Sequence, residues 1–332
     1  MSFTEAIIVF VSSLALSAAS SAVMARRLDQ ATAWLRFPEG LVGLVTALGA
    51  DTPEISSALT GIMSGNHDLG LGVIFGSNIF NLAALLGLSA IVAGHIRVGR
   101  PGVLLNGAVA LWITGVIAAQ AVGILPPLWV GILLAAALLP YIALLSIEAE
   151  TVAEFPGPAS VTKWLCRALG GAREDSNKGD KPREPTWIDL LALFPIVVMV
   201  ILASVGLVHS ALVLGNAFGI SKTVLGTLVL APLTGLPNLV AAIGLAKKGR
   251  GPAVVVESLN SNSLNLVVGV WLPSVIVGLS SPSGKSMFSL WWMTGMTVAA
   301  VGLCAFRRGL AWPGGAGLIA GYVAFMLYIV LS

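Results

Sequence analysis

Long apolar stretches alternate with short polar ones along almost the whole chain. A helix needs about 20 apolar residues to cross a bilayer core about 30 Å thick. The pattern predicts ten such segments: residues 4–24, 38–64, 68–93, 102–121, 126–147, 187–208, 221–247, 252–279, 287–306 and 312–331. Residues 148–186 are polar, with little apolar surface to bury, so we expect a linker there that is disordered in part. The pattern predicts an all-α polytopic membrane protein with about ten transmembrane helices.

Composition excludes a soluble enzyme. Of 332 residues, 57% are hydrophobic and 10% are charged, whereas soluble domains have roughly 45–50% apolar and about 25% charged residues. The net charge of +3 gives no basic face for nucleic acid. The glycine-rich residues 313–317 lack a P-loop lysine, so no nucleotide site is expected. We expect no catalysed reaction and no cofactor; the lipid bilayer and small cations are the expected partners.

Basic residues predict the orientation of the chain in the membrane. Lys and Arg concentrate in cytoplasmic loops, and with ten spans 16 of the 18 fall into one alternating set of loops. Only Lys222 and Lys285 fall into the other set. Both termini are therefore expected outside and the linker 148–186 in the cytoplasm. Five spans precede the linker and five follow it, so the two halves should enter the membrane in opposite directions.

The two halves also share a polar motif. A shift of 184 residues aligns Pro53 with Pro237, Gly65 with Gly249, Ser77 with Ser261, Asn78 with Asn262, Asn81 with Asn265 and Leu82 with Leu266. We therefore predict a first five-helix repeat over 1–147, a linker over 148–186 and an inverted second repeat over 187–332. Inverted repeats with helices interrupted by Gly and Pro indicate a transport site near the bilayer midplane.

Glycine and proline should interrupt the second helix of each half. Proline lacks an amide hydrogen and clashes with the carbonyl four residues earlier. We expect Gly49 with Pro53, and Pro232 with Gly235 and Pro237, to open these helices and free carbonyl oxygens for a cation. Ordinary kinks are the alternative, since Gly and Pro are frequent in membrane helices.

Three acidic residues fall within predicted spans and not at their ends: Asp51, Glu54 and Glu257. Ionisable residues within a membrane are costly and usually functional, and carboxylate, carbonyl and amide oxygens are the ligands of hard cations such as Ca²⁺. Asp51 and Glu54 are three residues apart and should titrate as a coupled pair, so a proton is a candidate participant in transport. Glu257, close to a cytoplasmic loop, is either a vestibule carboxylate or a side chain that reaches the interface.

Hydroxyl and amide side chains repeat in the third helix of each half. Ser77 and Asn81 are four residues apart, as are Ser261 and Asn265, so each pair projects from one helix face. Each pair can face the interrupted helix before it. The alternative is that these side chains only hydrogen-bond neighbouring helices.

These residues resemble the repeats of the cation/calcium exchanger superfamily, most closely those of prokaryotic sodium/calcium exchangers. That pattern is G-T-S-x-P-E followed by G-S-N-x-x-N. Here the first copy reads Gly49-Ala50-Asp51-Thr52-Pro53-Glu54 and then Gly76-Ser77-Asn78-Ile79-Phe80-Asn81; the second reads Leu233-Thr234-Gly235-Leu236-Pro237-Asn238 and then Asn260-Ser261-Asn262-Ser263-Leu264-Asn265. The resemblance implies Na⁺ and Ca²⁺ ligands at Glu54, Ser77, Asn81, Ser261 and Asn265.

The second copy departs from the pattern. Asn238 replaces its glutamate, and Asn265 stands where an acid is often found. Ala50-Asp51 and Thr234-Gly235 replace the Thr-Ser pair, and we keep these four residues with Asn238 in the expected metal site. An otherwise intact site would then carry a charge of −2, from Asp51 and Glu54 in one half.

The leading hypothesis is a secondary antiporter that exchanges Ca²⁺ for Na⁺ or H⁺ by alternating access, in a prokaryotic plasma membrane by analogy. Two alternatives stay open. One is a proton-coupled or monovalent-cation antiporter that has lost Ca²⁺ exchange, favoured by Asn238. The other is a non-transporting membrane sensor that retains the fold.

Overall fold

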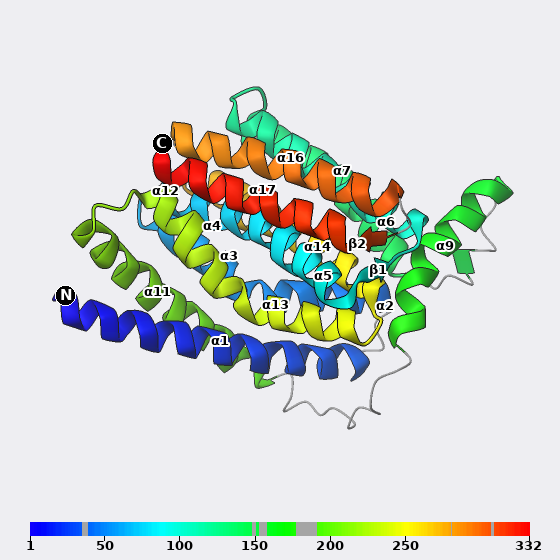
Figure 1. Cartoon of the computed structure of the whole chain (residues 1–332), viewed down its shortest axis with the longest axis horizontal. Coiled ribbons are helices and arrows are strands. Elements are labelled where there is room, and N and C mark those ends of the chain that lie inside the picture. The colour runs from blue at the N-terminus through cyan, green and yellow to red at the C-terminus, as the bar shows by residue number, and fades with distance from the viewer. Residues whose placement is uncertain (35–38, 148–150, 153–157, 177–190, 280, 307–308) are drawn as a thin grey trace.

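The fold is a bundle of long helices (Figure 1) in a computed structural model that describes residues 1–34, 39–147, 151–152, 158–176, 191–279, 281–306 and 309–332. The first repeat comprises α1 (Phe3–Trp34), α2 (Glu39–Ala50), α3 (Thr52–Met63), α4 (His67–Phe80), the π-helical segment η1 (Asn81–Leu88), α5 (Ser89–Ala93), α6 (Arg100–Ala121) and α7 (Pro127–Leu145). The second comprises α11 (Leu193–Ala217), α12 (Lys222–Val224), the π-helical η2 (Leu225–Leu230), α13 (Ala231–Lys247), α14 (Gly251–Leu266), the π-helical η3 (Val267–Trp271), α15 (Leu272–Ile276), α16 (Gly284–Phe306) and α17 (Trp312–Leu331).

Nine helical stretches of the described chain are long and apolar enough to cross a membrane. They match nine of the ten predicted segments. The remaining predicted segment, 38–64, is divided into the apolar helix over Leu41–Ala50 and α3. The two chain ends lie at the same end of the bundle (Figure 1), as an even number of spans requires.

The predicted interruption in the first repeat occurs at Asp51, between α2 and α3. Pro53 occupies the first turn of α3, where a missing amide hydrogen costs least. The amide of Asp51 still donates to the Ala47 carbonyl at 2.9 Å, and the amide of Ile55 to the Asp51 carbonyl at 2.9 Å. The interruption is therefore a kink at Asp51 and not an unwound segment.

The corresponding prediction for the second repeat is wrong. Helix α13 runs unbroken from Ala231 to Lys247 through Gly235 and Pro237. Pro232 lies in its first turn and therefore removes no internal hydrogen bond. The irregular backbone of this repeat is η2, which ends just before α13 begins. Pro237 still leaves the Leu233 carbonyl without its usual amide partner four residues later.

Two π-helical segments occur at corresponding places in the repeats. η1 begins at Asn81, and η3 begins two residues after Asn265, the equivalent of Asn81. Such segments are rare and often lie at functional sites. Both follow directly on the polar motif of the third helix, so each repeat changes its helical pitch beside its Ser and Asn side chains.

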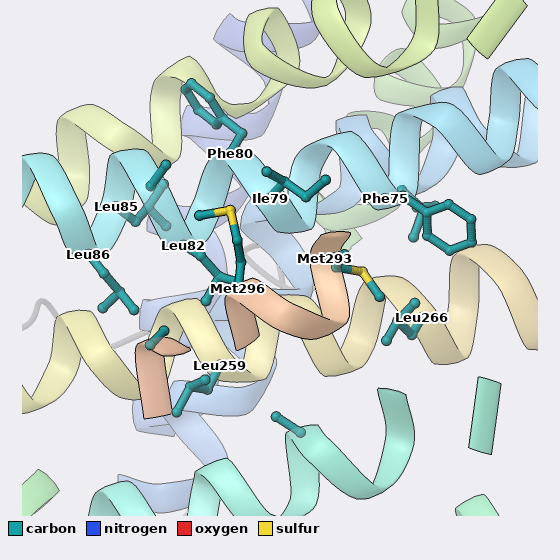
Figure 2. Packing of buried hydrophobic residues seen from close by; sticks show 14 of the residues in the cluster. Phe75, Ile79, Phe80, Leu82, Leu85, Leu86, Leu259, Leu266, Met293 and Met296 are labelled. Atoms are coloured by element: carbon teal, nitrogen blue, oxygen red, sulfur yellow. The ribbon is translucent and has the colours of Figure 1, made fainter. Parts of the chain in front are cut away.

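The central element is the continuous helix formed by α4, η1 and α5, the most deeply buried of the nine spans. Figure 2 shows its large side chains Phe75, Ile79, Leu82 and Leu85 in one buried cluster with Leu259 and Leu266 of α14 and Met293 and Met296 of α16. α1 and α11 lie side by side at one edge of the bundle (Figure 1). The polar motif of the first repeat is thus carried by the best-packed helix.

The linker is more ordered than its composition predicts. Helix α9 covers Ala159–Ser176 and packs against α6, α14 and α2. Ala168 is buried there, so the helix has an apolar face with a surface to cover. The rest of the predicted linker, except Thr151–Val152 and Pro158, lies outside the described residues, as do residues 187–190 of the sixth segment and residue 38 of the second.

A short two-stranded sheet joins the repeats. β1 (His95–Arg97) pairs antiparallel with β2 (Gly309–Ala311), at segments that the apolar pattern assigned to loops. The backbone of Gly309 has φ 137°, and a Cβ added there would clash with the Ile96 carbonyl oxygen. Only glycine adopts that backbone angle without strain, so Gly309 permits the pairing.

Candidate functional site

Asp51 and Glu54 occupy the interior of the bundle. Both have an exposed fraction of 0%, and they are the two fully buried charged side chains among the residues that the structure describes. Asp51 lies at the kink, and Glu54 one turn later in the first turn of α3. The two carboxylates are close enough to interact electrostatically. Both acids, which the sequence places within a predicted span, are thus buried in the bundle.

Asp51 is held by two side chains of the second repeat. Its Oδ1 accepts a hydrogen bond from Asn238 Nδ2 at 3.0 Å and one from Ser261 Oγ at 3.0 Å. Its other oxygen, Oδ2, is buried and has no hydrogen-bond partner among the described residues. Two donors therefore fix the carboxylate, and one oxygen stays open to a ligand.

The carboxylate of Glu54, like that of Asp51, has one hydrogen-bonded oxygen and one oxygen without a partner in the described chain. Oε2 accepts from Asn265 Nδ2 at 3.0 Å, and Oε1 is buried without a partner in the described chain. Ser77 faces this carboxylate without reaching hydrogen-bond geometry. Oε1 lies beside Gly235, where an added Cβ would be 3.1 Å away. Glycine at 235 thus leaves room for the glutamate.

Three further polar atoms of the predicted site are buried and unpartnered within the described residues: Ser77 Oγ, Asn81 Oδ1 and Asn265 Oδ1. The amide nitrogen of Asn81 has no partner either. Each unsatisfied buried polar group costs about 1–3 kcal/mol, and such groups in a native fold require an explanation. A set of them beside two half-satisfied carboxylates is what a cation-binding site would contain.

The hydrogen bonds cross between the repeats in a pattern set by their symmetry. Under the shift of 184 residues, Asp51 corresponds to Gly235 and Glu54 to Asn238. Asp51 bonds to the equivalent of Glu54, and Glu54 packs on the equivalent of Asp51. The same crossing pairs Glu54 with Asn265, the equivalent of Asn81. The site therefore lies where the two interrupted or proline-bearing helices meet.

The other predicted site residues lie at its edge. The carbonyl of Ala50, at the end of α2, accepts from Ser21 Oγ on α1 at 3.3 Å. The hydroxyl of Thr234 donates to the Leu230 carbonyl of its own helix at 2.9 Å. Glu257 is partly exposed and lies in the second turn of α14. Neither Ala50 nor Thr234 is bonded to the carboxylate of Asp51 or Glu54 in the described part of the chain, whereas Glu257 acts on Asp51 as a neighbouring negative charge.

Asn78 and Asn262 belong to the network, although residue chemistry alone did not select them. Asn78 Nδ2 donates to the Asn262 carbonyl at 3.1 Å, and Asn262 Nδ2 donates to the Asn78 carbonyl at 3.4 Å. These two residues are exact repeat equivalents, so the bonds lie across the pseudo-twofold axis. Asn78 Oδ1 also accepts from Asn265 at 3.1 Å. The alignment of Asn78 with Asn262 was the available signal.

The donor set suits a hard cation. Carboxylate, amide and hydroxyl oxygens are the ligands of Ca²⁺, whereas softer metals select thiolate or imidazole. No group of three or more His, Cys, Asp or Glu side chains that could hold a metal occurs among the described residues.

Curated proteins similar to this chain are membrane proteins and exchangers. "Inner membrane protein YrbG" of Escherichia coli K12 is 28% identical over 250 residues, covering 72% of this chain and 70% of that protein. "Sodium/potassium/calcium exchanger 1" of Bos taurus is 31% identical over 126 residues, which is 35% of this chain but 10% of that protein.

Solved structures share the fold across nearly the whole chain. The H⁺/Ca²⁺ exchanger CAX matches with a TM-score of 0.71 at 13% identity, covering 98% of this chain and 86% of that one. The sodium-calcium exchanger NCX_Mj matches with a TM-score of 0.59 at 20% identity, covering 99% and 100%. The family model described as "Sodium/calcium exchanger protein" matches twice, over residues 5–147 and 189–331. The chain belongs to the sodium/calcium exchanger protein family, as an integral membrane protein built from two inverted five-helix repeats.

Proposed function

We propose that the protein is a secondary active antiporter that exchanges Ca²⁺ for Na⁺ or H⁺ by alternating access. Asp51 and Glu54 supply the charge, and Ser77, Asn81, Ser261 and Asn265 supply neutral oxygens. The observation that carries the proposal is the pair of buried carboxylates that each keep one oxygen without a partner in the described chain. A Ca²⁺ ion needs carboxylates to offset its dehydration, and this pair balances its charge.

The cross-repeat bonds couple ion binding to movement of the repeats. The carboxylates belong to the first repeat, and their donors Asn238, Ser261 and Asn265 belong to the second. A shift of one repeat against the other must therefore remake the site. We take residues 1–147 and 187–332 as the two halves that move, with Glu257 as a vestibule carboxylate on the cytoplasmic side.

The relatives support the assignment by their names. Two of them are described as an H⁺/Ca²⁺ exchanger and a sodium-calcium exchanger, and YrbG is an inner membrane protein. We infer a prokaryotic plasma membrane for this chain, with both termini outside and the segment that contains α9 in the cytoplasm. The segregation of Lys and Arg into alternate loops supports this orientation.

A monovalent-cation or proton-coupled antiporter without Ca²⁺ exchange is the second candidate. Asn238 favours it, because an amide replaces the second repeat's glutamate and donates to Asp51 where a cation would otherwise be attracted. The site then has two charges in place of three. Ca²⁺ flux separates the two candidates directly.

The test is Ca²⁺ uptake into proteoliposomes, driven by an imposed Na⁺ gradient or, separately, by an imposed pH gradient. We expect uptake under one of the gradients and its loss in Glu54→Gln, which keeps the size of the side chain. Glu5→Gln, which removes an exposed carboxylate of α1, should retain uptake. Absence of Ca²⁺ flux under both gradients, with Na⁺ or H⁺ exchange retained, would establish the second candidate.

A further inference from the structure

We propose that this protein exchanges one Ca²⁺ for two monovalent charges and is therefore electroneutral, with Asn238 and Asn265 as the residues that set this ratio. The proposal rests on the antiport function above and adds its stoichiometry. The buried charge of the site is the sum of Asp51 and Glu54, since no other charged side chain of the described chain is fully buried.

The balance of charge follows from that count. A site of charge −2 is neutral with one Ca²⁺ bound and equally neutral with two monovalent cations bound. A net charge in the bilayer interior is unfavourable, so the two neutral forms are the ones that can change access. Neither half of the cycle then moves net charge across the membrane.

The number of unpartnered carboxylate oxygens agrees with a ratio of two monovalent cations to one Ca²⁺. Asp51 Oδ2 and Glu54 Oε1 each lack a partner among the described residues. Each can take one monovalent cation or proton, or the two can share one divalent ion. The other carboxylate oxygens already accept hydrogen bonds from Asn238, Ser261 and Asn265, which leaves them less able to attract a third cation.

Asn238 and Asn265 act as neutral donors at positions where a carboxylate would raise the charge. The amide nitrogen of Asn238 is 3.0 Å from Asp51 Oδ1, and that of Asn265 is 3.0 Å from Glu54 Oε2. An oxygen in place of either nitrogen would face a carboxylate directly. Such a pair of like charges needs one more cation between them, so a third carboxylate would change the ratio.

The experiment measures the Ca²⁺ ratio at which net flux stops, in proteoliposomes whose voltage is set by a K⁺ gradient and valinomycin. For the wild type we expect no dependence on voltage. At zero voltage, an about tenfold gradient of the coupling ion should balance an about 100-fold Ca²⁺ gradient by mass action. Separate Na⁺ and pH gradients identify which monovalent ion is coupled.

Asn238→Asp is the matched variant, because it keeps the side-chain shape and adds one charge. With one net charge moved per cycle, its zero-flux Ca²⁺ ratio should shift tenfold for each about 59 mV. Asn238→Gln, which adds no charge, should remain independent of voltage. If Asn238→Asp does not fold or transport, Asn265→Asp tests the same effect at the other carboxylate.

Two outcomes overturn the proposal while leaving antiport intact: a wild-type ratio that shifts with voltage, or an active Asn238→Asp that stays electroneutral. The first rejects the ratio, and the second rejects the role of Asn238. Absence of wild-type Ca²⁺ flux under every gradient would instead reject the proposed function itself. A voltage-independent wild type with a voltage-dependent variant supports both.

Discussion

The two repeats occupy equivalent places in the bundle but differ at the site. Asp51 and Glu54 in the first repeat correspond to Gly235 and Asn238 in the second, so among the described residues one half carries two fully buried carboxylates and the other carries none. The second half contributes amide and hydroxyl donors that bond to those carboxylates. A pseudo-symmetric fold can therefore hold an asymmetric site, because symmetry of the backbone does not require symmetry of charge.

The backbones of the two repeats also differ at the site. The first repeat kinks at Asp51, whereas α13 of the second repeat passes unbroken through the equivalent residue, Gly235. The kink places the carboxylate of Asp51 at the meeting point of the repeats. Gly235 supplies the complementary space for Glu54. The first repeat thus supplies the carboxylates, and the second supplies the space at Gly235 that Glu54 occupies.

The largest effect is expected at the charged half. Asp51→Asn removes one of two carboxylates without changing the shape of the side chain. Two unit charges 4 Å apart attract by about 4 kcal/mol at an effective dielectric constant of 20, which predicts a loss of Ca²⁺ affinity of at least about 100-fold. Isothermal titration of purified protein with Ca²⁺ measures it. Unchanged affinity would show that Asp51 does not face the ion.

The equivalent asparagines Asn81 and Asn265 should respond in opposite ways. Neither polar side-chain atom of Asn81 has a partner among the described residues, so Asn81→Leu should stabilise the Ca²⁺-free protein by about 1–3 kcal/mol. It should also abolish the rise in melting temperature that Ca²⁺ causes. Asn265→Leu should instead destabilise the Ca²⁺-free protein, because it breaks bonds to Glu54 and Asn78.

Thermal unfolding of both variants with and without Ca²⁺ provides the comparison. Equal destabilisation of the two would mean that Asn81 has a structural role like that of Asn265. A normal Ca²⁺-induced shift in Asn81→Leu would remove it from the proposed ligand set.

Adding a side chain at Gly235, in the second repeat, should disturb Glu54 in the first repeat. A Cβ at 235 would lie 3.1 Å from Glu54 Oε1 and from the ring of Phe80, a tight contact in a packed interior. Overpacking of this kind costs about 1–3 kcal/mol, so Gly235→Ser should slow transport about tenfold. Gly244→Ser on the same helix meets nothing within 4 Å and is the matched control; equal rates in the two variants would contradict this account.

The smallest effects are expected on the pseudo-twofold axis. Asn262→Ala removes one amide that donates to the opposite repeat, and Asn78→Ala removes one that also contacts Asn265 and Met293. We expect Asn78→Ala to lower thermal stability more than Asn262→Ala. The double variant should deviate from additivity by about 0.5–3 kcal/mol, since the residues share one network. Strict additivity in melting experiments would mean that the two bonds are independent.

Much of the fold could be predicted from the sequence. Apolar stretches long enough to span a bilayer must form helices that bond their own backbone groups, so the segments, the inverted repeat and the burial of Asp51 and Glu54 followed from pattern alone. The same pattern did not predict α9, whose few apolar residues matter only because α6, α14 and α2 offer a surface to cover. The β1–β2 pair likewise needs two segments about 214 residues apart in the sequence to come together.

The site shows the same limit at the level of single residues. Composition and the repeat identified Asp51, Glu54, Ser77, Asn81, Ser261 and Asn265 as the polar groups of the interior. They could not tell that the side-chain nitrogen of Asn265 is hydrogen-bonded while neither polar side-chain atom of Asn81 is, within the described part of the chain. They also overstated the effect of Pro232 and Pro237, because a proline in a first turn, or one flanked by neighbouring helices, need not interrupt a helix.

By itself, the sequence determined that the chain is an all-α membrane protein of about ten spans in two inverted repeats. The spans follow from the cost of placing polar groups in hydrocarbon, which acts on every residue separately, and the repeats follow from the shared polar motif. The tertiary structure decided which carboxylate oxygens are occupied, that Gly235 lies against Glu54, and that the donors of one repeat bond to the acids of the other. Those facts depend on contacts between residues about 180 to 210 positions apart, and only packing brings them together.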